Sequence, residues 1–87
     1  MKDELIEALS YVQMSPYREI TLKELKNSEK IPSRIAKNTN IATSHISRAL
    51  AGLKKKGLVT ILNPEKSQGR LYQITELGLE VIEKLET

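Results

Sequence analysis

The sequence predicts a mainly α-helical domain that carries one small β-hairpin. Aliphatic residues recur three or four positions apart along several segments, which is the spacing of a helix with one buried face. Near residue 60, two short runs rich in β-branched residues flank a cluster of turn-forming residues, which is the pattern of a hairpin. The 87 residues suffice for one domain with a single core, and that core must be aliphatic because the chain has no Phe or Trp.

The first helix is expected over about residues 3–14. Ser15 can cap a second helix, and Pro16 suits its first position because an N–H would be unpaired there. This second helix is expected to end at about Asn27. Thr21 occupies a position in it where an aliphatic residue would fit the pattern better.

After a polar connection, Ile31 fits a short strand, and a third helix is expected over about Pro32–Thr39. A fourth helix is expected over about Thr43–Lys56. Gly57 follows three lysines there, and both features suit a helix C-terminus, because glycine adopts the left-handed conformation and cations favour the negative end of the helix dipole.

The hairpin is expected to consist of strands over about Leu58–Leu62 and Arg70–Ile74. Between them, residues 63–69 have the composition of a turn. Thr75 can cap a last helix that runs to about Leu85.

The segment from Pro32 to Leu53 has the spacing of a helix-turn-helix. Ala36 is small enough for two steeply crossing helices to touch, and Asn40 tolerates the left-handed backbone of a tight turn. Ile41 can then fill the core. The second helix would bury a stripe that consists of Ile46, Ala49, Leu50 and Leu53. A helical hairpin without any nucleic-acid role could show this pattern, but the hairpin that follows makes a winged helix-turn-helix the prediction.

Charge is divided unevenly along the chain. From Lys30 to Arg70 there are nine basic residues and a single acidic one, Glu65, whereas the net charge of the whole chain is only +3. A basic segment within ordered sequence favours a surface that docks a polyanion. The alternative is a solvated face that keeps a small domain soluble.

The outward face of the fourth helix favours DNA over a general polyanion. At about 100° per residue, Ser44, Arg48, Ala51 and Lys55 lie opposite the aliphatic stripe. Compact side chains let a helix approach the floor of a major groove about 12 Å wide, and Arg48 could then form two hydrogen bonds to a guanine.

Ser47 and Lys54 flank that face, and a wing over about residues 58–74 would carry cations beside the adjacent backbone or minor groove. The predicted DNA-binding residues are Thr43, Ser44, His45, Ser47, Arg48, Lys54, Lys55, Lys66, Gln68 and Arg70. For His45, the only histidine, idle exposure is the alternative.

Other classes of function find no support in the composition. Without cysteine and with one histidine, the sequence offers no transition-metal site, catalytic triad or nucleophile, so no enzyme activity, cofactor or metal is predicted. The sequence contains no long apolar run, so we expect no membrane span and a cytoplasmic protein.

Four segments together resemble the winged-helix transcription regulators of the MarR/ArsR-like type that are common in archaea. They are residues 35–41, 44–50, 56–59 and 69–78, and the resemblance covers about Tyr17 to Leu85. Together with the helical periodicity at both ends of the chain, the sequence predicts one winged-helix domain over residues 1–87, with the helix-turn-helix at about 32–56 and flanking helices at about 3–14 and 75–86. The resemblance implies a homodimer that reads double-stranded DNA as a transcription regulator. No membrane contact is expected, and no effector is assigned.

Two positions depart from this family. Ala42 and Ile31 stand where a capping hydroxyl is usual, so we expect the cap of the fourth helix to pass to Thr43. The ligands of the metal-sensing branch are also absent. A winged-helix module that binds protein, and a nucleic-acid-binding protein of low specificity, remain the alternative functions.

Overall fold

Five helices and one two-stranded antiparallel sheet make up the described part of the chain, residues 3–87 of a computed structural model. In chain order they are α1 (Asp3–Gln13), α2 (Pro16–Glu24), α3 (Pro32–Thr39), α4 (Thr43–Lys55), β1 (Val59–Ile61), β2 (Tyr72–Ile74) and α5 (Glu76–Glu86). The predicted fold class, mainly α with a small β-hairpin, is confirmed.

Two predicted helix caps are present. The Ser15 Oγ accepts a hydrogen bond from the Arg18 amide at 3.5 Å, and Pro16 is the first residue of α2. The Thr75 Oγ1 accepts from the Gly78 amide at 3.2 Å and also donates to the Gly57 carbonyl at 2.7 Å. Thr75 therefore ties the start of α5 to the turn that follows α4.

Helix α2 is shorter than predicted. It ends at Glu24, three residues before the expected end at Asn27. The amides of Leu25 and Lys26 donate to the carbonyls three residues earlier, each at 3.1 Å, so the last turn is tighter than an α-helix. Leu25, the C-cap residue, has its side chain buried in the core.

The turn between α3 and α4 has the predicted left-handed residue. Asn40 has φ 58° and ψ 34°, and the Ile41 amide donates to the Ala36 carbonyl at 3.2 Å. The expected transfer of the α4 cap to Thr43 is wrong. Ala42 is the N-cap and provides no side-chain hydrogen bond, and Thr43 is already helical, whereas a capping side chain comes from the residue before the helix.

The sheet pairs Val59 with Ile74 and Ile61 with Tyr72. Both strands are shorter than predicted. A further backbone pair joins Lys30 to Tyr72, through hydrogen bonds of 3.0 and 2.9 Å between their amides and carbonyls. The extended residue before α3 that pairs with the sheet is therefore Lys30, and the prediction of Ile31 was wrong by one position.

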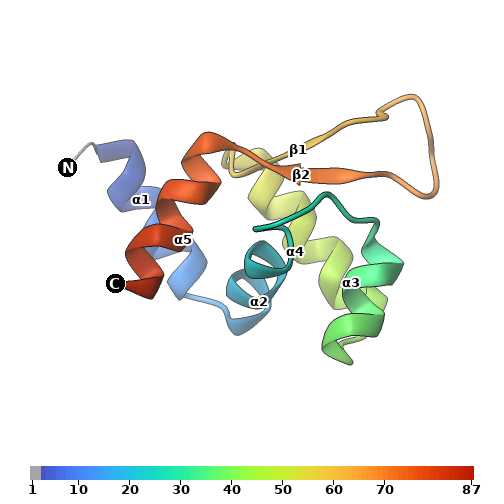
Figure 1. The fold of residues 1–87 in the computed structure, drawn as a ribbon, viewed down its shortest axis with the longest axis horizontal. Coiled ribbons are helices and arrows are strands. Elements are labelled where there is room, and N and C mark those ends of the chain that lie inside the picture. Colours follow the sequence, from blue (N-terminus) through green and yellow to red (C-terminus); the bar gives the residue numbers. More distant parts are fainter. Residues whose placement is uncertain (1–2) are drawn as a thin grey trace.

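Buried residues from all five helices and from the base of the hairpin form one core. Figure 1 shows how these elements are arranged. Helices α1 and α5 pack side by side at one end with the C-terminus, and the loop between β1 and β2 extends at the opposite end. Helix α2 packs on α4 between these ends. Among the described residues, the buried side chains are aliphatic as predicted, with one polar exception, Thr21, which is 0% exposed.

Candidate nucleic-acid interface

Helix α4 separates a buried face from an exposed one, as its sequence predicts. Ile46, Leu50 and Leu53 are 0% exposed and pack in the core. On the opposite face the side chains are exposed, namely those of Ser44, Ser47, Arg48, Ala51 and Lys55. A row of short side chains with one arginine in its middle is thus presented to solvent.

Nine of the ten predicted DNA-binding residues are exposed. On α4 they are Thr43, Ser44, Ser47, Arg48, Lys54 and Lys55, and on the hairpin they are Lys66, Gln68 and Arg70. Two lysines in the last turn of α4 and the C-cap Lys56 precede Gly57, which has φ 78° and so takes the left-handed conformation that was expected.

His45 is different because it is partly buried. Its ring stacks on the ring of Tyr17 from the first turn of α2, with 4.6 Å between ring centroids and 12° between ring planes. The idle exposure considered for His45 is therefore wrong. This stack could not be predicted from local sequence, because the two residues are far apart in the chain and meet only when α2 packs on α4.

The tip of the hairpin is held by its own side chains. The Asn63 Oδ1 accepts from the Leu71 amide at 2.7 Å, while its Nδ2 donates to the Gly69 carbonyl at 3.2 Å. Gly69 has φ 67°, which allows the reversal. The Arg70 Nε donates to the Lys66 carbonyl at 2.7 Å, so Arg70 braces the loop with one of its five N–H groups.

A depression of about 570 Å³ lies between α4 and the hairpin. It brings together four predicted residues from two distant segments, Thr43 and Ser47 from α4 with Gln68 and Arg70 from the hairpin. Ser33, near the start of α3, also lines it. In contrast, Lys54 and Lys55 lie at the other end of α4, near the base of the hairpin, so they do not share this depression.

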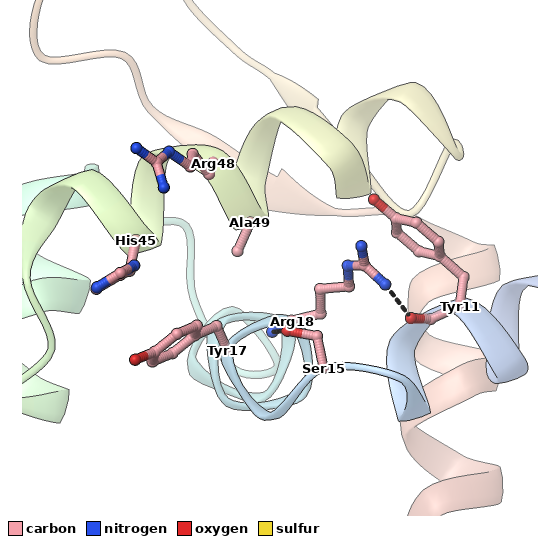
Figure 2. Close-up of a pocket in the computed structure, with 7 residues that line it drawn as sticks. All are labelled: Tyr11, Ser15, Tyr17, Arg18, His45, Arg48 and Ala49. Atoms are coloured by element: carbon pink, nitrogen blue, oxygen red, sulfur yellow. Dashed lines mark hydrogen bonds between the residues drawn. The ribbon is translucent and has the colours of Figure 1, made fainter.

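A second depression of about 360 Å³ lies beside α4 where α1 and α2 meet it (Figure 2). Its lining residues are Tyr11, Ser15, Tyr17, Arg18, His45, Arg48 and Ala49. The Arg18 guanidinium donates to the Tyr11 carbonyl at 2.9 Å and lies 3.8 Å from the centre of the Tyr11 ring. Sequence reasoning did not select Tyr17 or Arg18, since both lie outside the predicted helix-turn-helix.

The basic segment is not neutralised by ion pairs within residues 3–87. The two ion pairs found there join Lys23 to Glu19 at 2.9 Å and Lys26 to Glu86 at 2.7 Å. None of these four residues belongs to the basic segment, residues 30–70. The positive charge of residues 30–70 is therefore available to an external anion. Among the described residues, no cluster of three or more histidine, cysteine or carboxylate side chains could hold a metal ion. No helix in this part of the chain has the length and apolar character needed to span a bilayer.

Solved structures share this arrangement. TubR from Bacillus thuringiensis serovar israelensis, solved bound to 24 bp of tubC, matches with a TM-score of 0.79 at 11% identity, over 94% of this chain and 91% of TubR. Reduced HlyU from Vibrio cholerae matches with a TM-score of 0.77 at 22% identity, over 94% of this chain and 85% of HlyU. At these low identities, the TM-scores show similarity of fold alone.

Two longer proteins match in part. A MarR family transcription regulator has a TM-score of 0.72 at 18% identity over 94% of this chain, and the chain spans 58% of its length. The chain spans half of the length of ZitR from Lactococcus lactis, with a TM-score of 0.72 at 19% identity over 83% of this chain. No curated protein shows significant sequence similarity to the chain.

A family model described as winged helix-turn-helix matches residues 9–87, which include every element from α2 to α5 and the C-terminal part of α1, residues 9–13. The arrangement of α3, α4 and the hairpin agrees with that description. The chain belongs to the winged helix-turn-helix family.

Proposed function

We propose that the protein is a transcription regulator that binds double-stranded DNA in a sequence-specific manner. Helix α4 enters the major groove, and the hairpin, as the wing, contacts the adjacent backbone or minor groove. The observation that supports this most strongly is the exposed face of α4, where the exposed side chain of Arg48 stands among those of Ser44, Ser47 and Ala51. The solved complex of TubR with DNA supports the same kind of ligand.

Different side chains take different roles in this proposal. Arg48 reads a base, because its guanidinium can form two parallel hydrogen bonds to guanine. Ser44 and Ser47 reach base edges or phosphates, and Thr43 lies at the first turn beside them. The cations bind phosphates and so contribute affinity without sequence preference; they are Lys54, Lys55, Lys66 and Arg70.

Selection of bound duplexes from a random pool tests the proposal. A regulator should enrich one sequence and should bind it at least about a thousandfold more tightly than unrelated duplexes. On the selected duplex, Arg48→Ala should cost about 1–3 kcal/mol and should relax the preference at one base pair. Lys84→Ala is the matched control, because Lys84 is an exposed cation on α5.

The same experiments separate the alternatives. A pool that yields no preferred sequence, together with tight binding to every duplex, would identify a nucleic-acid-binding protein of low specificity. No binding to any duplex would favour a protein-interaction module. If Arg48→Ala left binding to the selected duplex unchanged, the role of α4 would be wrong.

We also propose a homodimer of the MarR/ArsR-like, archaeal type that joins its subunits through α1 and α5. The support is apolar surface at the end away from the wing, where Ile6 is 46% exposed and Leu79 is 44% exposed. Sedimentation equilibrium should give a dimer for the natural chain, and the pair of changes Ile6→Glu and Leu79→Glu should shift it toward monomer. A monomer at high micromolar concentration would remove this proposal. If the protein binds chromosomal DNA, it acts in the cytoplasm. We also propose that residues 1–87 form a single winged-helix domain.

A further inference from the structure

Helix α4 has a depression along each of its two flanks. The wing forms one of them, and residues of α1 and α2 form the other. A duplex that receives a helix in its major groove presents two phosphate backbones, one on each side of that helix. The wing accounts for one backbone only, so the second depression lies where the other backbone would pass.

The chemistry of the second depression suits a phosphate. Two of its lining residues are the cations Arg18 and Arg48, and none is acidic. Three lining residues carry hydroxyl groups, namely Tyr11, Ser15 and Tyr17. The nearest acidic residue in the sequence is Glu19, whose carboxylate is already engaged by Lys23 at 2.9 Å. Positive charge also continues to the C-cap of α4, where the Lys56 Nζ lies 5.3 Å from the centre of the Tyr11 ring.

Two of these side chains are held in place before any ligand arrives. Arg18 donates one N–H to the Tyr11 carbonyl and stacks on the Tyr11 ring, which leaves four of its five donors for another partner. Tyr17 is 41% exposed, and the ring of His45 stacks on it. Figure 2 shows Arg18 extending from α2 toward α4, and Tyr17 beside His45. Fixed side chains lose little conformational entropy on binding.

Given that the protein binds DNA as proposed above, we propose that this depression binds the phosphate backbone on the side of α4 away from the wing. Arg18 and Tyr17 contact the phosphates directly. His45 acts as a positioning residue that holds Tyr17. This role takes the place of the direct DNA contact that the sequence predicts for His45. The protein then grips both backbones that border the major groove, and α2 joins α4 and the wing in the interface.

Salt dependence of binding tests the role of Arg18. The probe is a mixed-sequence duplex of about 20 base pairs, two helical turns, followed by fluorescence anisotropy. Removing one phosphate contact lowers the slope of log K against log[salt] by about 0.9 in magnitude. Arg18→Gln should show that change, with about tenfold weaker binding for one charged hydrogen bond. Arg18→Lys should keep the slope, because it keeps the charge, and Lys84→Gln on α5 should not alter it.

Tyr17→Phe tests the hydroxyl without disturbing the stack on His45. It should weaken binding a few-fold with an unchanged salt slope, since an uncharged group is lost. His45→Ala should weaken binding to a similar degree, and adding Tyr17→Phe to His45→Ala should weaken it no further. His45→Phe should retain binding, because its ring can still stack on Tyr17. Additive losses for His45→Ala and Tyr17→Phe would contradict the positioning role.

Arg18 also contributes to packing, so thermal unfolding of each variant must accompany the titrations. If Arg18→Gln does not fold, ethylation interference with the natural chain on the duplex selected from the random pool decides the question. Interference at phosphates on both strands bordering the groove of α4 supports the proposal, and interference on the wing side alone overturns it. If Lys55→Gln weakens binding but Arg18→Gln and Tyr17→Phe do not, this inference fails and the proposed function stands. If none of the three weakens binding, the proposed function fails as well.

Discussion

Thr21 is the residue whose replacement should stabilise the fold. Its side chain is 0% exposed, and its Oγ1 has no hydrogen-bond partner among the described residues. A buried hydroxyl without a partner costs about 1–3 kcal/mol relative to its hydration in the unfolded chain. Thr21→Val replaces the hydroxyl by a methyl group of nearly the same shape and has a similar helix propensity.

The expected gain in the free energy of unfolding is about 1–2 kcal/mol, the lower part of that range, because valine fills the site without new contacts. For a domain of this size, each kcal/mol raises the Tm by about 4–8 °C. Urea titration should give a higher midpoint with an unchanged slope, which assigns the change to stability rather than compactness. Thr60→Val, at an exposed position of β1, is the matched control and should shift stability by less than about 0.5 kcal/mol. A destabilised Thr21→Val protein would refute the reasoning, because it would mean that the hydroxyl is hydrogen-bonded in the native core.

Three further predictions concern the fold and the interface. Gly78→Ala should destabilise by about 1–3 kcal/mol in urea titration, since its Cβ would lie 2.4 Å from the Leu58 carbonyl oxygen; unchanged stability would contradict the close packing of α5 on the hairpin. Asn40→Gly should be tolerated, whereas Asn40→Ala should cost about 1 kcal/mol because φ is positive there; equal stability of the two variants would argue against the left-handed turn. Lys55→Ala and Lys66→Ala should each weaken binding to all duplexes alike and reduce the salt slope by about 0.9, and a loss of sequence preference alone would be inconsistent with phosphate contacts.

Local signals in the sequence were sufficient to predict the structure at positions where a single residue determines the backbone conformation or caps a helix. Asn40 and Gly57 take the left-handed conformations that were predicted for them, and Ser15 and Thr75 cap the helices that follow them. The exposed face of α4 also followed from the helical period, because its aliphatic stripe is regular. These features depend on residues close together in the chain.

Features that depend on contacts between distant segments could not be predicted. Lys30 pairs with Tyr72 across 42 residues, and nothing in the local sequence distinguishes it from Ile31. The stack of His45 on Tyr17 and the placement of Arg18 beside α4 likewise appear only when α2 packs on α4. For this reason the sequence analysis selected His45 and Arg48 on the side opposite the wing but missed the residues that α2 contributes there.

The central claim is that the outward face of α4 meets DNA. Its most direct test is an NMR titration of isotope-labelled protein with the duplex selected from the random pool. The account predicts that the amide signals of Ser44, Ser47 and Arg48 shift strongly, while those of Leu79 and Glu83 on α5 stay in place. Shifts centred on α5, with the signals of α4 unchanged, would contradict it.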